Sequence, residues 1–211
     1  MRLSFVSIPV ASIIFLFSAC GSGQKGLNTD APEAAEGDPF PPFIGISVKG
    51  ATIDNTVFND RVTLVSAWRL GCRWSMLEIA EYNEMIGEIQ NDRFQVISFA
   101  PHTKDEMETF YRRDESMLNQ IKEAIDVPIA VPEYDVLPMC SLKRFSQPDT
   151  IAAQCDALRD MLGVEEFPVT FVVGPDGVIR HRHDGLIVNE DTMEPDISEF
   201  RADLDSLLRV L

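Results

Sequence analysis

The sequence predicts an α/β fold in which a largely parallel sheet is covered by helices on both faces. Short apolar or β-branched runs alternate with longer stretches of helical period, which is typical of such sheets. The last two runs are joined by a tight turn, Gly174-Pro175-Asp176-Gly177, which predicts a hairpin. The 192 residues from 20 to 211 suit one domain with an insertion better than two full domains.

The first 19 residues are predicted to be a signal peptide outside the folded domain. One basic residue, Arg2, precedes an apolar stretch over 5–17, which is too short for a spanning helix. The ending Phe17-Ser18-Ala19-Cys20 resembles the lipobox of bacterial lipoproteins, which implies cleavage before Cys20 and lipid attachment to it. An uncleaved anchor or an ordinary signal peptide is the alternative. We expect the protein to be exported to the cell envelope, facing the periplasm and anchored to a membrane by lipid.

Residues 20–40 are rich in Gly, Pro and acids and lack an apolar period, so they are predicted to be a flexible tether. A coil of this length reaches roughly 25 Å, enough to hold a domain at 41–211 away from a membrane surface. Removal of residues 1–19 takes away one Arg and leaves 17 basic and 34 acidic residues, a net charge of −17. This charge argues against nucleic-acid binding, which needs basic patches.

Turn residues and apolar periods predict the remaining elements in order. Met76 and Ile79 lie on the apolar stripe of the first helix, and Glu78 and Glu81 are expected to be mostly outward. The predicted elements are a hairpin from 43–48 and 51–58, a strand over 62–67, a helix over about 73–90, a strand over 94–99, a helix over about 104–125, a short strand over 127–131, a loop over 133–148, a helix over about 150–162, strands over 169–173 and 178–183, and a helix whose stripe runs from 197 to 211.

A cysteine stands at the junction between the strand over 62–67 and the following helix. Unpaired N–H groups and the helix dipole favour a thiolate at this position, and the thiolate is the form that attacks disulfides. Arg69 and Arg73 flank Cys72 and could stabilise the charged sulfur; two solvated side chains are the alternative. Ser75 stands three residues on, where a redox helix often carries a second cysteine, so the sequence predicts a one-thiol redox site.

Two motifs carry a family resemblance. Trp68, three residues and then Cys72 at a helix start resemble the Trp-x-x-x-Cys-x-x-Cys site of thioredoxin. Phe167-Pro168-Val169-Thr170-Phe171 resembles the cis-proline strand of the same fold, and the turn that follows, Gly174-Pro175-Asp176-Gly177-Val178-Ile179-Arg180, is similar as well. The N-terminal hairpin and the long stretch between the motifs are similar to the TlpA and ResA-like branch. The resemblance implies a thioredoxin-like fold with an N-terminal β-hairpin and an insertion before the cis-Pro strand, in an exported thiol–disulfide protein.

The resemblance also implies how the two motifs work together. A cis bond before Pro168 would turn the preceding backbone outward, free to pair with an extended substrate. An ordinary trans-proline at a strand edge is the alternative, and we expect the cis form. Phe167, Pro168, Trp68 and Trp74 are then candidate substrate contacts, although one or both tryptophans could be structural.

The departures from this family pattern limit the expected chemistry. Ser75 replaces the resolving cysteine, and Ser66 occupies the place of a buried acid, where it cannot shuttle protons. Three outcomes stay open: an external thiol resolves a mixed disulfide on Cys72, Cys140 or Cys155 resolves it, or the domain is a binding module without catalysis. Because Cys20 is predicted to be lipidated, Cys140 and Cys155 could instead pair with each other.

Other chemistries are less favoured. A peroxiredoxin would need Thr or Ser two or three residues before the cysteine, where Arg69-Leu70-Gly71 stands, and a copper chaperone of the Sco type would need a second cysteine. His181 and His183 are expected to be exposed, and His102 is a weak candidate for a proton donor. We expect no metal and no cofactor. The expected partners of this monomer are a disulfide-bonded envelope protein or a small thiol.

Overall fold

The computed structural model describes residues 34–139, 160, 162–186, 188–189 and 195–209. The elements, in chain order, are β1 (Ile44–Ile46), β2 (Thr52–Asp54), the 3₁₀ helix η1 (Asn55–Phe58), β3 (Val62–Ala67), α1 (Arg73–Glu88), β4 (Phe94–Ala100), α2 (Lys104–Tyr111), α3 (Glu115–Ala124), β5 (Asp135–Pro138), β6 (Val169–Val173), β7 (Ile179–Asp184) and α5 (Ser198–Arg209). The predicted α/β fold is confirmed, and so are the N-terminal hairpin and the hairpin of the last two strands.

The central sheet has five strands in the order β5-β4-β3-β6-β7. Strands β3, β4 and β5 are parallel, whereas β6 runs antiparallel to β3 and β7 antiparallel to β6. The sheet is therefore mixed rather than largely parallel. Its edge strand β5 lies within the segment 133–148 that was predicted to be a loop, and the strand predicted over 127–131 is absent from the described residues there. Pro128 deprives that segment of a ladder donor, which weakens it as a strand.

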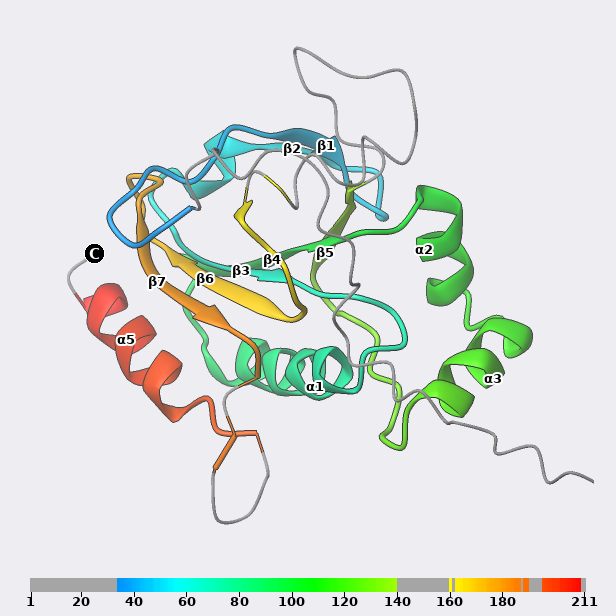
Figure 1. Cartoon of the computed structure of the whole chain (residues 1–211). Helices are drawn as coiled ribbons and strands as arrows, with labels where there is room; N and C mark the ends of the chain where they lie inside the picture. The colour runs from blue at the N-terminus through cyan, green and yellow to red at the C-terminus, as the bar shows by residue number, and fades with distance from the viewer. Residues whose placement is uncertain (1–33, 140–159, 161, 187, 190–194, 210–211) are drawn as a thin grey trace, which may run out of the picture.

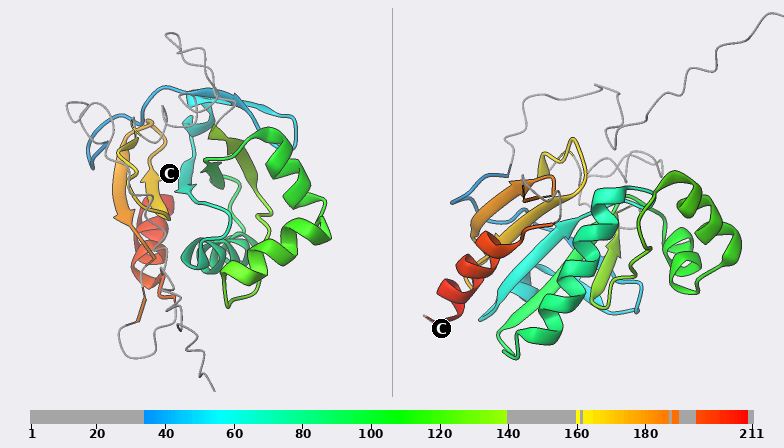
Figure 2. Two further views of the ribbon diagram at one scale, coloured as in Figure 1. Left: turned by 45° about the vertical axis from the view of Figure 1, so that its right-hand side comes forward. Right: turned by 90° about the horizontal axis from the view of Figure 1, so that it is seen from below.

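Other elements of the chain pack on both faces of the sheet (Figure 1), and each face carries a cluster of buried apolar side chains. Helices α1 and α5 pack on one face, where Tyr82 and Phe200 join side chains of β3 and β6 in one core cluster. The hairpin β1–β2 lies on the other face, where Phe43 packs against both Phe58 and Phe99. Helices α2 and α3 form a pair beside the β5 edge, as the two views of Figure 2 show. Both faces of the sheet are thus covered, which is why β3 is buried along its whole length.

The segment 34–40 belongs to the folded domain, whereas the composition placed it in the tether. Phe40 is 3% exposed and lies against the rings of Phe43, Phe58, Phe99 and Phe171. The backbone of this segment also covers the edge of β7, since the Gly37 N–H donates to Ile179 O at 2.8 Å. The folded part therefore includes residue 34. A buried aromatic and a sheet edge hold this segment, and both outweigh its polar composition.

The helix predicted over 104–125 is divided into α2 and α3. Thr103 begins α2 with a capping box in which its hydroxyl accepts the Glu106 N–H and the Glu106 side chain accepts the Thr103 N–H. Arg113 then adopts a left-handed conformation with φ 56°, and the Asp114 side chain caps α3 by accepting the Met117 N–H. The left-handed residue and the new cap end one helix and begin the next within three residues. Among the described residues, no helix has the length and apolarity needed to cross a membrane.

Candidate functional site

Three loops meet at one end of the central strands of the sheet. Strands β3 and β4 are parallel and end there together, with Ala67 opposite Phe99. Strand β6 begins at the same end because it runs antiparallel to β3, with Ala67 opposite Val169. The loop after β3, the loop after β4 and the residues before β6 are therefore neighbours. Cys72, His102 and Pro168 lie in these three loops.

The thiol of Cys72 faces the backbone of the proline loop. Cys72 is the N-cap residue of α1, and its Sγ lies 3.5 Å from the carbonyl oxygen of Phe167, to which the thiol donates. The Phe167–Pro168 peptide bond is cis, which confirms that expectation. Cys72 and Phe167 are both buried, with exposed fractions of 0% and 6%. The structure thus joins two motifs that lie 95 residues apart in sequence.

The loop before Cys72 is held by a short set of hydrogen bonds. The Cys72 N–H donates to Arg69 O at 3.3 Å, and the Arg69 N–H donates to the Ser75 hydroxyl oxygen at 3.3 Å. Gly71 has φ +71°, a conformation that side chains with a Cβ rarely adopt. The buried Ser75 therefore closes the loop onto the first turn of α1. This contact is the role that the structure shows for the residue at the place of a resolving cysteine.

His102 supports the same loop from β4. Its Nε2 accepts the Leu70 N–H at 3.1 Å, so the ring must be unprotonated at this nitrogen. Burial lowers the pKa of His102 below 6.5, the nearby charge of Arg69 lowers it further, and the carboxylate of Glu106 opposes both. The sequence suggested a proton donor near Cys72 at this position. The observed bond makes His102 an acceptor that orients the loop.

The two tryptophans occupy different environments. Trp68 is fully buried, packs against Phe110 and donates its indole N–H to the Ser98 hydroxyl at 3.0 Å. It is a core residue here and does not offer the substrate contact that we expected of it. Trp74 is partly exposed and lies beneath the guanidinium of Arg73, 5.2 Å from the ring centroid. Only Trp74 lies at the surface as a candidate contact.

The two arginines that flank Cys72 differ in the same way. Arg73 forms an ion pair with Asp126 and stacks on Trp74, and stabilisation of a Cys72 thiolate by this residue remains a prediction. Arg69 is partly buried, and its charge acts on His102. Stabilisation of a thiolate by Arg69 remains a prediction.

A buried acid lies on α1, where the helical period predicted an outward side chain. Glu78 is 2% exposed; its Oε2 accepts from Ser66 at 2.7 Å, and its Oε1 accepts from Thr170 at 2.8 Å and from Tyr82 at 3.1 Å. Burial raises the pKa of Glu78 to about 7, although the three hydrogen bonds oppose this rise. Sequence reasoning missed this group. The available signals were the polar residues Ser66 and Thr170 within otherwise apolar strands and the Glu78–Tyr82 spacing of four.

Three cysteines and two histidines that the sequence analysis named lie outside the contacts of the Cys72 loop given above. Cys20, Cys140 and Cys155 fall outside the described residues, so their lipidation, pairing or resolving roles remain predictions. His181 is partly exposed and lies 3.4 Å from Asp203 and 3.8 Å from Glu36, and His183 stacks edge-on against Phe200. Within the described ranges, no group of His, Cys, Asp and Glu side chains could hold a metal ion.

Comparison with known proteins agrees with this geometry. The model of the AhpC/TSA family matches residues 36–182. A crystal structure provisionally identified as the thiol:disulfide interchange protein DsbE from Chlorobium tepidum is similar with a TM-score of 0.55 and 16% identity, covering 83% of this chain and 99% of that chain. The thioredoxin domain of a thiol-disulfide oxidoreductase from Bacteroides vulgatus gives a TM-score of 0.51 and 18% identity, covering 82% of this chain and 98% of that chain. A thiol peroxidase from Chromobacterium violaceum gives 0.52 and 10%, with 85% and 89% covered. No curated protein is significantly similar in sequence.

A mixed sheet with a cysteine at a helix N-terminus opposite a cis-proline defines a thioredoxin-like fold, and the structural neighbours share it. The family match covers more than half of the chain. The chain therefore belongs to the AhpC/TSA family.

Proposed function

We propose that this protein is a thiol–disulfide oxidoreductase or isomerase whose helix-start motif supplies a single reactive sulfur, that of Cys72. The observation that carries the proposal is the contact between Cys72 Sγ and the Phe167 carbonyl oxygen, 3.5 Å apart, at the N-terminus of α1. This arrangement places the sulfur beside the backbone that precedes a cis-proline and next to the unpaired N–H groups of a helix. Ser75 offers no second sulfur on the same turn.

The proposed reaction has two exchange steps. The thiolate of Cys72 attacks one sulfur of a substrate disulfide, forms a mixed disulfide and releases the other substrate sulfur as a thiolate. A second thiol then attacks the substrate sulfur of the mixed disulfide, and Cys72 leaves as a thiolate. An external thiol makes the net reaction an exchange in which one substrate sulfur is reduced and the external thiol is oxidised. A different cysteine of the substrate makes it an isomerisation, because a new substrate disulfide forms. If Cys140 or Cys155 resolves the mixed disulfide instead, its thiolate attacks Cys72 Sγ, forms an internal disulfide and releases the substrate sulfur as a thiolate; an external thiol then reduces that internal disulfide.

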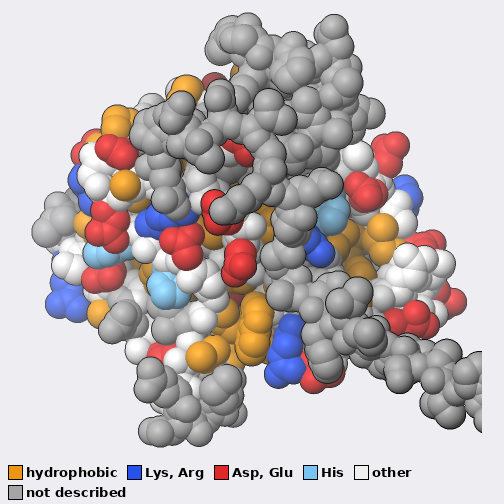
Figure 3. Space-filling model, in the orientation of Figure 1, with side chains coloured by type: hydrophobic (Ala, Val, Ile, Leu, Met, Phe, Trp, Pro, Cys, Tyr) orange, Lys and Arg blue, Asp and Glu red, His pale blue; other side chains and the backbone are white. Residues whose placement is uncertain are grey.

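We further propose that the protein works in the cell envelope, facing the periplasm and anchored to a membrane by lipid. A signal peptide over 1–19, lipid on Cys20 and a tether up to residue 33 would hold a monomeric domain near the membrane surface. The face in Figure 3 carries scattered acidic side chains and fewer basic ones, and the whole chain has a net charge of −16. This charge argues against a nucleic acid as partner. Because the proposed chemistry is thiol–disulfide exchange, the partner we propose is a disulfide-bonded envelope protein or a small thiol.

A binding module without catalysis is the second candidate, and the burial of the site favours it. The side chains of Cys72 and Trp68 are both fully buried, so a substrate disulfide can reach the sulfur only if the site opens. In that case the thioredoxin-like domain would bind a partner without exchanging thiols. The two candidates differ in the reactivity of one sulfur.

The test compares the full chain, purified in mild detergent, with its Cys72→Ser variant. Each is mixed with oxidised glutathione and with a disulfide-bonded peptide, and mixed disulfides are identified by mass spectrometry after acid quenching. The proposed function predicts an adduct on Cys72 that a free thiol removes, and none on the variant at that position. Hydrogen peroxide in place of the disulfide shows whether the same sulfur prefers peroxides. Absence of an adduct on Cys72, with the chain folded by circular dichroism, contradicts the exchange reaction and leaves the binding module.

A further inference from the structure

Arg182 is a nearly buried cation in the middle of an outer strand. Its side chain is 9% exposed, it lies opposite Phe171 in the β6–β7 register, and its guanidinium carbon is 5.4 Å from the centroid of the Phe171 ring. A buried charge is unfavourable unless its hydrogen-bonding groups are satisfied. The guanidinium of Arg182 therefore needs hydrogen-bond acceptors, and three separate segments of the chain provide them.

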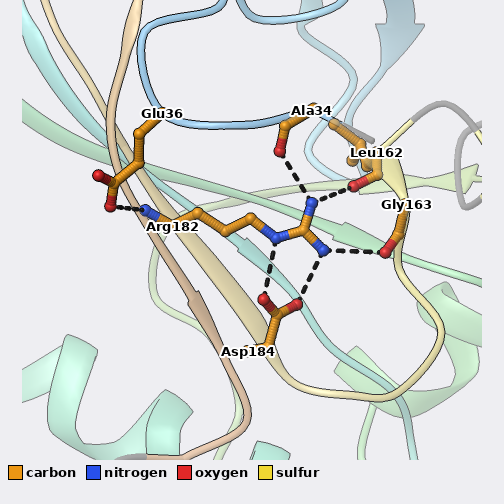
Figure 4. A network of polar contacts seen from close by, with 6 residues as sticks. All are labelled: Ala34, Glu36, Leu162, Gly163, Arg182 and Asp184. Carbon is orange, nitrogen blue, oxygen red and sulfur yellow. Dashed lines mark hydrogen bonds and ion pairs between the residues drawn. The ribbon is translucent and has the colours of Figure 1, made fainter. Parts of the chain in front are cut away.

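Every N–H donor of the Arg182 guanidinium is used (Figure 4). Nη1 donates to Ala34 O at 2.8 Å and Leu162 O at 2.9 Å, and Nη2 donates to Gly163 O at 2.9 Å. Nε and Nη2 also form a bidentate pair with Asp184, at 2.9 and 2.8 Å. The Arg182 backbone N–H donates to the Glu36 side chain at 3.2 Å. A lysine ammonium has three donors and cannot reproduce this planar set.

These contacts hold both ends of the loop that leads to the cis-proline. Leu162 and Gly163 lie at its beginning and are bound directly by Arg182. At its end, Gly185, next to Asp184, donates its N–H to Pro168 O at 2.8 Å. The residues between these points include Phe167, whose carbonyl oxygen accepts the Cys72 thiol. The Arg182–Asp184 pair thus spans the loop that positions this carbonyl.

We propose that Arg182 is a positioning residue for the thiol site: it fixes the Phe167 carbonyl opposite Cys72 by clamping residues 162–163 and the N-terminal segment to β7. The expected effect of Arg182 on disulfide exchange rests on the proposed function. Its effect on the environment of the sulfur is independent of that function. Loss of the clamp releases the thiol from its carbonyl acceptor and misplaces the backbone that faces a substrate.

The test uses the full chain and four variants. Arg182→Met removes the guanidinium and keeps an apolar stem, Arg182→Lys keeps the charge without the fork, and Asp184→Asn weakens the pair at the surface. Arg180→Met is the matched control, since Arg180 lies on the same strand and forms an exposed ion pair with Asp176. Cys72 alkylation by iodoacetamide is followed from pH 5 to 9, and exchange with a disulfide-bonded peptide is measured on the same samples. All rates are taken at temperatures where each variant is folded.

The two readouts should move in opposite directions. We expect alkylation of Arg182→Met to be several-fold faster and its pH profile to differ from that of the unmodified chain, because the thiol loses the carbonyl to which it donates. Peptide exchange should fall by about 10- to 100-fold, as expected when a reacting pair is misplaced by about 1 Å. Arg182→Lys should behave like Arg182→Met, Asp184→Asn should be intermediate, and Arg180→Met should match the unmodified chain.

Two results would overturn the proposal. One is a pH profile and an exchange rate in Arg182→Met that equal those of the unmodified chain, because a merely structural residue would change only the unfolding free energy. The other is full rescue by Arg182→Lys. If Arg182→Met does not fold, the same two criteria apply to Asp184→Asn. If the unmodified chain exchanges no disulfide, the proposed function fails, whereas the pH profile of alkylation still decides whether Arg182 positions the sulfur.

Discussion

The Ser66 hydroxyl in β3 donates a hydrogen bond of 2.7 Å to the Glu78 carboxyl group on α1. Thr170, opposite Ser66 in the β3–β6 register, donates to the other carboxyl oxygen. The resembled family places a buried acid at the position of Ser66. In this chain the acid instead comes from the helix that begins at Cys72, six residues after the sulfur, and the strand residue serves as its hydrogen-bond donor.

Glu78→Gln tests whether this carboxyl group is protonated near neutral pH. Burial raises its pKa from 4.5 to about 7, so the folded state binds a proton that the unfolded state releases between these values. Stability from this group is therefore complete below pH 4.5, declines as the pH rises to about 7 and is constant above. Relative to the unmodified chain, Glu78→Gln should gain up to about 3 kcal/mol between pH 4.5 and 8. Urea unfolding at several pH values measures this difference. A constant difference would show that the pKa is not raised.

His102→Phe removes the acceptor of the Leu70 N–H and keeps an aromatic ring. We expect a loss of about 1–2 kcal/mol in unfolding free energy at pH 8, because the N–H loses its partner. The pH dependence should change as well. Burial lowers the pKa of His102 below 6.5, so its contribution is complete above pH 6.5 and is lost as the pH falls through the lowered value. Urea titrations at pH 5 to 8 should therefore show a difference in unfolding free energy between the unmodified chain and His102→Phe that grows as the pH rises, since the opposite slope from Glu78 is common to both. The surface variant His181→Gln is the control, and an equal slope in His102→Phe would count against the interpretation.

Phe40→Ala tests whether the segment 34–40 belongs to the folded domain. Phe40 is 3% exposed and contacts four aromatic rings, so the substitution should cost about 3–5 kcal/mol of unfolding free energy. Ile44→Ala, at a side chain 39% exposed, should cost less than about 1 kcal/mol. Thermal or urea unfolding of both variants decides the matter. A similarly small loss of unfolding free energy in both variants would indicate that residue 40 belongs to the tether and not to the folded domain.

Ser75→Cys restores a second sulfur one helical turn after Cys72. We expect the introduced thiol to attack Cys72 Sγ in the mixed disulfide, form an internal disulfide with Cys72 and release the substrate as a thiolate, whereas the unmodified chain retains the mixed disulfide until an external thiol arrives. Mass spectrometry after acid quenching distinguishes the two: the unmodified chain should accumulate the adduct on Cys72, and the variant should not. Equal adduct lifetimes would indicate that another thiol already resolves Cys72.

Local sequence patterns determined a large part of this fold. The β-branched run of β6, the turn at 174–177 and the apolar stripe of α5 each depend on neighbours within a few residues, and the structure contains all three. The position of Cys72 at a helix start was also predictable, because a strand pattern changes to a helical one at that residue. The cis bond at Pro168 was expected from the resemblance rather than from local propensity.

Only the tertiary structure decided which polar groups are inside. A helical period assigned Glu78 to the outer face, yet Ser66 and Thr170, from two other elements, satisfy it in the interior. Arg182 lies on the outer strand β7, where a charged residue is expected to face water. Its five N–H donors are instead satisfied by Asp184, two residues further on, and by carbonyl groups from two distant segments. The extra domain segment at 34–40 and the edge strand β5 depend likewise on surfaces formed elsewhere in the chain. The periodicity of a sequence reflects whether each side chain is polar or apolar, and so predicts which side chains face water. A buried polar group is stable only where distant segments provide its hydrogen-bond partners, and periodicity does not reveal those.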